Sequence, residues 1–173
     1  MDIFPLVFAI GLIALGSAIA QGTAQQISRT GSFELPCSAD TAFPLFGPEG
    51  ERHWVKGWNP QPIFPDKIEF SRDAVFTQGS GDEEAVWTIV DVDWQTHRAE
   101  YVRLAPASHS GHIVVTIESV DAAHCRVMVS YTVTAFGEHS GRVLASFSEE
   151  AYAAKMRDWK QKISSYLENR KSR

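Results

Sequence analysis

The side chains that most often carry out chemistry are present, but none of them stands in a recognised catalytic or metal-binding pattern. No two of the histidines form a metal signature such as H-E-x-x-H. His109 and His112 make an H-x-x-H pair, but residues three apart on a strand point to opposite faces. G-x-S-x-G and the glycine patterns that hold phosphates or dinucleotides are also missing. We therefore expect no metal, no cofactor and no nucleophilic catalysis.

Four bulky side chains inside strand-like stretches are the more informative candidates. Tyr101 and Arg103 share one face by the two-residue period of a strand, and Trp87 and Tyr131 lie in two other such stretches. Two interpretations stay open for the aromatic residues: ordinary core, or the lining of an internal cavity. An inward Arg103 needs an acid or a ligand carboxylate, whereas an outward one is an ordinary solvated charge.

Residues 47–65, GPEGERHWVKGWNPQPIFP, combine four prolines with two tryptophans and a histidine. Proline-rich segments are usually surface loops, and bulky aromatic residues do not belong on plain loops. We interpret the segment as a structured flap over a hollow, with His53, Trp54 and Trp58 as its lid. The alternative is that the tryptophans fasten short helices to a sheet.

The elements that must position these residues follow from periodicity and turn signals. A short strand at 32–35 precedes a short helix at 39–46, which Ser38 caps, and a helical turn at about 48–55. Alternating, β-branched stretches bounded by turn residues then predict an antiparallel meander. Its strands are expected at 68–70, 74–78, 85–92, 98–104, 112–120 and 125–135.

The last stretch, residues 140–170, predicts one amphipathic helix of roughly 40 Å. Its apolar stripe contains Phe147, Met156 and Trp159, and Glu, Lys and Arg occupy the other side. Such a stripe must lie on the sheet, and a curved sheet that grips a helix tends to leave an internal cavity. The sequence thus predicts an α+β domain with a hollow.

Length and charge limit the classes of function. The 173 residues are enough for one domain, and the net charge of −5, with no cluster of Lys and Arg before the last residues, argues against a nucleic-acid partner.

The N-terminus carries its own signal. Residues 3–20 hold no charge and end in an A-x-A pattern, so residues 1–26 predict a signal peptide or a membrane anchor. The protein would then be exported, periplasmic or secreted, or membrane-anchored through residues 3–20. No basic residue precedes Arg29, and the alternative is a cytoplasmic protein whose start codon is assigned too early.

Several motifs make residues 30–168 resemble the START-like superfamily, also called SRPBCC or the polyketide cyclase/dehydratase and lipid transport superfamily. The resemblance is carried by F-x-L-P with S-A-D-T-A-F-P-L-F (33–46), P-E-G-E-R-H-W-V-K-G-W-N-P (48–60), V-W-T-I-V-D-V-D (86–93), E-Y-V-R (100–103) and S-Y-T-V-T-A (130–135). Within this superfamily, the sequence is similar to one bacterial branch whose members are mostly uncharacterised.

The resemblance implies a helix-grip domain over residues 27–173. In that fold a curved antiparallel sheet of about seven strands wraps around a long C-terminal helix, and two short helices follow the first strand. It also implies a cavity for an apolar or amphipathic small molecule. Because the first and last strands of this fold pair antiparallel, Cys37 and Cys125 approach each other, and we hypothesise a disulfide between them.

We therefore predict binding, and by extension transport, of a hydrophobic or amphipathic molecule such as a lipid, without catalysis. The alternative is a cyclase- or dehydratase-like enzyme in which a cavity Tyr or His is the general acid–base. The predicted cavity and lid residues are His53, Trp54, Trp58, Trp87, Tyr101, Arg103, Tyr131, Phe147, Met156 and Trp159.

Overall fold

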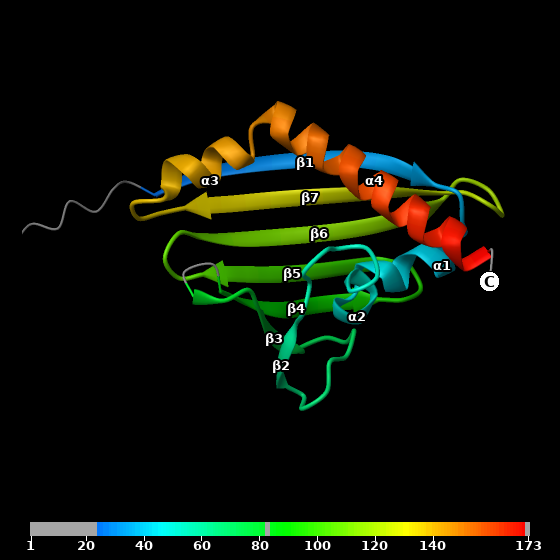
Figure 1. The fold of residues 1–173 in the computed structure, drawn as a ribbon, viewed down its shortest axis with the longest axis horizontal. Coiled ribbons are helices and arrows are strands. Elements are labelled where there is room, and N and C mark those ends of the chain that lie inside the picture. Colours follow the sequence, from blue (N-terminus) through cyan, green and yellow to red (C-terminus); the bar gives the residue numbers. More distant parts are fainter. Residues whose placement is uncertain (1–23, 82–83, 172–173) are drawn as a thin grey trace, which may run out of the picture.

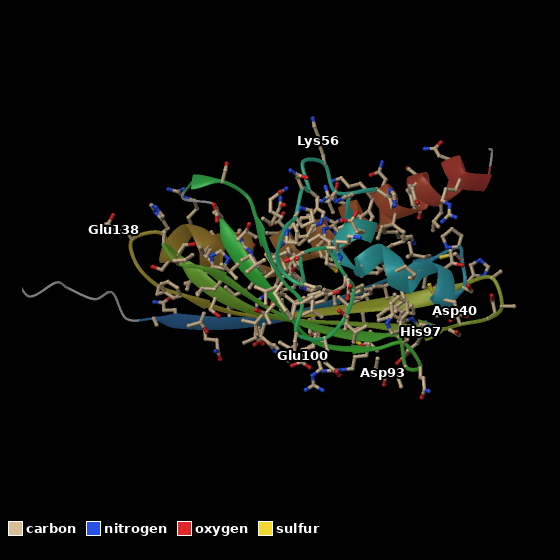
Figure 2. The ribbon with its side chains drawn as sticks, turned by 90° about the horizontal axis from the view of Figure 1, so that it is seen from below. Asp40, Lys56, Asp93, His97, Glu100 and Glu138 are labelled. Atoms are coloured by element: carbon tan, nitrogen blue, oxygen red, sulfur yellow. The ribbon has the colours of Figure 1, made fainter. Side chains whose placement is uncertain are left out.

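A computed structural model describes residues 24–81 and 84–171, which form an antiparallel sheet with helices on one face (Figures 1 and 2). Most of the predicted signal or anchor segment lies outside the described residues, and the first strand already begins at Gln25. Among the described helices, none combines the length and the apolar character that a membrane crossing requires.

The strands are β1 (Gln25–Leu35), β2 (Gln61–Phe64), β3 (Val75–Gln78), β4 (Ala85–Asp93), β5 (Arg98–Ala105), β6 (His109–Ser119) and β7 (Cys125–Ala135). The helices are α1 (Ala39–Ala42), the 3-10 helix η1 (Phe43–Phe46), α2 (Pro48–Glu51), α3 (Ser140–Ser146) and α4 (Glu149–Lys171).

The seven strands lie in the order β1-β7-β6-β5-β4-β3-β2, so the chain closes back on itself when the last strand pairs with the first. Gln25 lies opposite Ala135, and Leu35 lies opposite Cys125, with no shift of register between them. A register shift between Ile89 and Asp91 in β4 is a bulge, which bends the strand and adds to the curvature of the sheet.

The C-terminal region is two helices, not the single helix that the periodicity predicts. Ser148 ends the continuity because it caps α4: its Oγ accepts from the backbone N–H of Ala151 at 3.2 Å. Glu149 and Glu150 follow in the first turn, where acidic residues are favoured. Because the apolar stripe continues across the break, the periodicity alone predicts one helix and does not show the N-cap at Ser148.

A second correction concerns residues 68–70, which form no strand. Phe70 instead packs its ring on Phe43, with 5.1 Å between the centroids. The partner of β3 is β2, whose Pro62 lies opposite Phe76 at the edge of the sheet. Isolated apolar residues that pack individually gave the same local pattern as a strand.

The short helices after β1 form as predicted, in three pieces. Ser38 caps α1 by accepting from the Thr41 N–H at 3.3 Å. Pro44 lies near the start of η1, and Pro48 begins α2. Gly50 has a packing role, because a Cβ there would lie 2.0 Å from the carbonyl oxygen of Pro44. The absence of a side chain at Gly50 therefore lets α2 pack tightly against η1.

Helix α4 crosses the β1 edge of the sheet (Figure 1). Gly31 of β1 lets it approach closely, since a Cβ at Gly31 would lie 2.6 Å from Cγ of Met156. Tyr152 ties the helix to the next strand by donating from its hydroxyl to the Val129 carbonyl at 2.8 Å. Together these elements are the predicted α+β helix-grip fold.

Candidate functional site

A cavity of about 860 Å³ lies between the sheet, α2, α3 and α4. This volume is in the range of ordinary small-molecule sites. Seven of the ten predicted site residues line it: Trp58, Trp87, Tyr101, Arg103, Tyr131, Phe147 and Trp159. Glu51, His109 and Lys155 also line it, and none of these three is among the predicted site residues.

One wall of the cavity is a group of stacked aromatic rings. Trp87 lies parallel to Phe76, with 6.0 Å between centroids and 5° between planes. Trp58 meets Trp87 edge-on at 5.6 Å, and its Nε1 donates to the Pro48 carbonyl at 2.8 Å. Trp87 Nε1 is buried and has no hydrogen-bond partner among the described residues. The wall is therefore apolar except for one unpaired donor.

Arg103 lies on the inner face of β5. Its guanidinium carbon is 5.6 Å from the centre of the Trp87 ring. Two outward neighbours on the same strand are exposed, Val102 and Leu104, as the alternation requires. Glu100 also lies on the outer face, turned away from the helices in Figure 2, where it contacts Arg98 and His112. The choice that alternation left open is therefore settled in favour of the inward orientation.

The hydrogen-bond partner of Arg103 in the cavity is His109. Nη1 of Arg103 donates to Nε2 of His109, and Nδ1 of His109 lies 2.8 Å from Oγ of Ser108. This arrangement suits a neutral imidazole that carries its proton on Nδ1. Burial, followed by the nearby charges of Arg103 and Lys155, lowers the pKa of His109 to about 4. Burial also lowers the pKa of Arg103.

Lys155 of α4 lines the cavity, although the periodicity predicts that the lysines of this helix lie on its outer side. Its Nζ is 4.2 Å from the centre of the Phe147 ring and 5.4 Å from that of Tyr131. Burial, and then the charge of Arg103, lowers the pKa of Lys155. The signal was available: position 155 is three residues after Tyr152 and four before Trp159, on the same side of the helix.

Glu51, the last residue of α2, lines the cavity from the opposite side to the strands. Burial raises the pKa of its carboxyl from 4.5 to about 8, so the group is mostly protonated at neutral pH. The residue is three positions after Pro48 and three before Trp54, both of which are buried. That spacing was the only sequence signal for an inward carboxyl, and two neighbours are too few to establish a helical period.

The tyrosines differ in what their hydroxyls contact. Tyr101 donates to the carbonyl of Phe46 at 2.8 Å, which fixes it between the sheet and η1. Burial, and then the nearby Glu51, raises the pKa of both Tyr101 and Tyr131. Both hydroxyls therefore stay protonated at neutral pH.

Three predicted residues lie outside the cavity. Trp54 is buried between η1 and α4: its Nε1 donates to the Leu45 carbonyl at 2.7 Å, and its ring centre lies 5.3 Å from that of Trp159. His53 stacks on Tyr166 of α4, with 4.8 Å between ring centres. Met156 is buried against β1. The segment around α2 thus covers the cavity with Trp58 and Glu51 rather than with His53 and Trp54.

The cysteines lie away from the cavity. Cys37 and Cys125 are both buried thiols in the structure, and Cys125 opposes Leu35 across the β1–β7 pair. A hydrogen bond with Cys37, and then burial, raises the pKa of Cys125. The disulfide stays a prediction. Within residues 24–81 and 84–171, no three His, Cys, Asp or Glu side chains gather in a way that could hold a metal ion.

No protein-family model and no curated protein sequence matches the chain. Solved structures do match its fold. A norcoclaurine synthase from Thalictrum flavum, in complex with dopamine and hydroxybenzaldehyde, is 12% identical with a TM-score of 0.57, over 92% of this chain and 95% of that one. The structure of Ara h 8.0201 is 11% identical with a TM-score of 0.60, over 84% of this chain and 99% of that one.

An uncharacterised protein from Rhizobium leguminosarum has a TM-score of 0.62 at 10% identity, over 85% of this chain and 97% of that one. At these identities the matches show a shared fold, on which chemistry can differ from one protein to the next.

Proposed function

We propose that the protein binds an apolar or amphipathic small molecule in the cavity between its sheet and its helices. The observation that carries the proposal is the 860 Å³ space lined by aromatic side chains. Protein interiors are otherwise close-packed, so an aromatic-lined space of this size is typical of a small-molecule site. The structure of norcoclaurine synthase with dopamine and hydroxybenzaldehyde supports the proposal, because it shows small aromatic molecules bound to a protein of this fold.

Burial of the ligand's apolar surface supplies the main driving force, at roughly 25 cal/mol per Å². The rings of Trp58, Phe76 and Trp87 form the surface against which a flat or flexible apolar body packs. The polar end of the ligand lies toward Arg103 and His109, where the lining changes from apolar to charged.

The test uses N-phenyl-1-naphthylamine, a neutral probe that fluoresces in apolar sites. We expect one probe to bind per chain. Val143→Trp places a large ring in the cavity from α3 and should weaken binding at least tenfold. Val120→Trp makes the same change at an exposed position and should leave binding unchanged. Absence of binding by the folded wild type, or equal binding by Val143→Trp, would overturn the proposal.

A second candidate function, acid–base catalysis on the bound molecule, is favoured by Glu51. A desolvated carboxyl with a pKa of about 8 is suited to exchange protons near neutral pH. Tyr101 and His53 are less suited, since the hydroxyl of the first is engaged with Phe46 and the second lies outside the cavity.

Deuterium exchange next to the carbonyl of 2-tetralone, followed by NMR, tests this candidate. An enzyme of this kind accelerates the exchange, and Glu51→Gln abolishes the acceleration without loss of probe affinity. If wild type and Glu51→Gln exchange the ketone at the same rate, the catalytic candidate is rejected and binding remains.

A further inference from the structure

The polar groups of the cavity are mostly donors, and the two strongest carry a positive charge. Arg103 and Lys155 line the same cavity, and the charges of both lower the pKa of His109. Trp87 Nε1 adds a buried donor that has no partner within the described part of the chain. Both cations are half-buried, and a cation that loses water is destabilised unless an anion or several acceptors compensate it.

The described part of the chain supplies no such anion. None of its ion pairs includes Arg103 or Lys155, whereas Arg98, on the outer face of the same strand, contacts both Asp91 and Glu100. The acid that lines the cavity is Glu51, whose carboxyl burial keeps mostly protonated at neutral pH. What Arg103 and Lys155 contact instead is a neutral imidazole and the faces of aromatic rings.

We infer that the ligand is an amphipathic carboxylate whose anionic group binds between Arg103 and Lys155. This inference rests on the proposed function and narrows it to one class of ligand. A guanidinium presents two parallel N–H donors that match the two oxygens of a carboxylate, and the lysine adds a point charge from α4. The aromatic wall around Trp87 then receives the apolar body.

The charge of the cavity makes this selection depend on pH. The titratable groups that face it are Glu51 from α2, Tyr101 and Arg103 from β5, His109 from β6, Tyr131 from β7, His139 and Arg142 at α3, and Lys155 from α4. Near pH 7 Glu51 and His109 are mostly neutral, so the net charge of the lining is positive. Arg103 and Lys155 are half-buried and carry that charge inside, whereas Arg142 is exposed. Above about pH 8 Glu51 becomes negative and opposes a bound carboxylate.

The experiment compares two ligands that differ at one end, dodecanoate and 1-dodecanol, as displacers of N-phenyl-1-naphthylamine. At pH 7 we expect wild type to prefer dodecanoate at least tenfold. The double variant Arg103→Met/Lys155→Met should bind both ligands equally, while still binding the neutral probe. Arg98→Met, the matched control on the outer face of β5, should keep the preference. Between pH 7 and pH 9 the preference of wild type should fall, and Glu51→Gln should reduce that fall.

The outcomes separate the inference from the proposed function. If the probe binds and wild type does not prefer dodecanoate over dodecanol, the inference is overturned and the cavity remains a site for neutral molecules. If the double variant keeps the full preference, the two cations are not the site. Failure of the probe and of both ligands to bind would overturn the proposed function itself.

Discussion

The space between the sheet and the helices has two ends that differ in how they are filled. At the end near α1, Phe43 is completely buried and its ring contacts Phe70, Trp94 and His97 at centroid distances of 5.1, 5.0 and 5.6 Å. At the end near α3, the same sheet and helices enclose a cavity of about 860 Å³. One fold thus holds a close-packed core beside a hollow.

The polar groups of the two ends differ as well: those at the packed end have partners, and several at the hollow end do not. At the packed end His97 contacts the carboxylate of Asp40 at 2.8 Å, close together in Figure 2. At the hollow end Arg103 and Lys155 have no acidic partner among the described residues, and Trp87 Nε1 has no acceptor. We infer that the packed end supplies stability and that the hollow end is left unsatisfied for a ligand.

The largest expected effect is on stability at the packed end. Phe43→Ala should lower the free energy of unfolding by about 3–5 kcal/mol, because a fully buried ring leaves a cavity when it is removed. Val143→Ala, at the rim of the existing cavity, should cost less than about 1 kcal/mol, since few contacts are lost there. Urea unfolding measures both. Equal losses would contradict the division into a packed and a hollow end.

The next effect concerns Glu51 and pH. Since burial raises the pKa of this carboxyl from 4.5 to about 8, the folded chain binds the proton more tightly than the unfolded chain. Its contribution to the free energy of unfolding is therefore fully present below pH 4.5 and is lost as the pH rises to about 8. At roughly 1.4 kcal/mol per pKa unit the loss amounts to a few kcal/mol.

Urea unfolding midpoints at pH 5 and pH 8.5 test this prediction. The midpoint of wild type should fall between the two pH values, and that of Glu51→Gln should fall less. Glu150→Gln, an exposed acid at the start of α4, is the control and should follow wild type. A Glu51→Gln variant that loses as much stability as wild type over this range would show that the carboxyl is solvated.

The smallest effect has the opposite sign. Lys155→Met keeps the unbranched stem of the side chain and removes a partly desolvated charge, so without ligand it should raise the free energy of unfolding by about 1 kcal/mol. This corresponds to a gain in Tm of roughly 2–4 °C for a domain of this size. Calorimetry of the ligand-free protein measures it. Lys162→Met, which breaks the exposed contact with Asp158, should lower Tm slightly, and a lower Tm for Lys155→Met would contradict the prediction.

Much of the fold was predictable from local patterns. The strands from β3 to β7 follow alternation and turn residues, and Ser38 and Pro48 mark the short helices. The same patterns could not distinguish Phe70, which packs singly, from a strand residue, nor show that Ser148 interrupts the C-terminal helix. Both errors arise where a local pattern fits two tertiary arrangements.

The site was also predictable only in part, because alternation shows which residues share a face but not what that face contacts. Alternation placed Tyr101 and Arg103 on one face, and the structure shows that this face is the inner one. Charged residues inside, Glu51 and Lys155, were missed because a charge on an amphipathic element is normally solvated. His53 and Trp54, which the sequence placed at the lid, contact α4 and η1 instead.

The sequence by itself determined most of the strands, the order of the elements and which residues share a face, because those depend on the spacing of apolar residues along the chain. Only the tertiary structure decided which end of the interior is filled and which polar groups lose water there. The physical reason is that packing density and desolvation depend on neighbours from distant strands and helices. That Arg103, from β5, and Lys155, from α4, line one cavity is a property of the assembled fold alone.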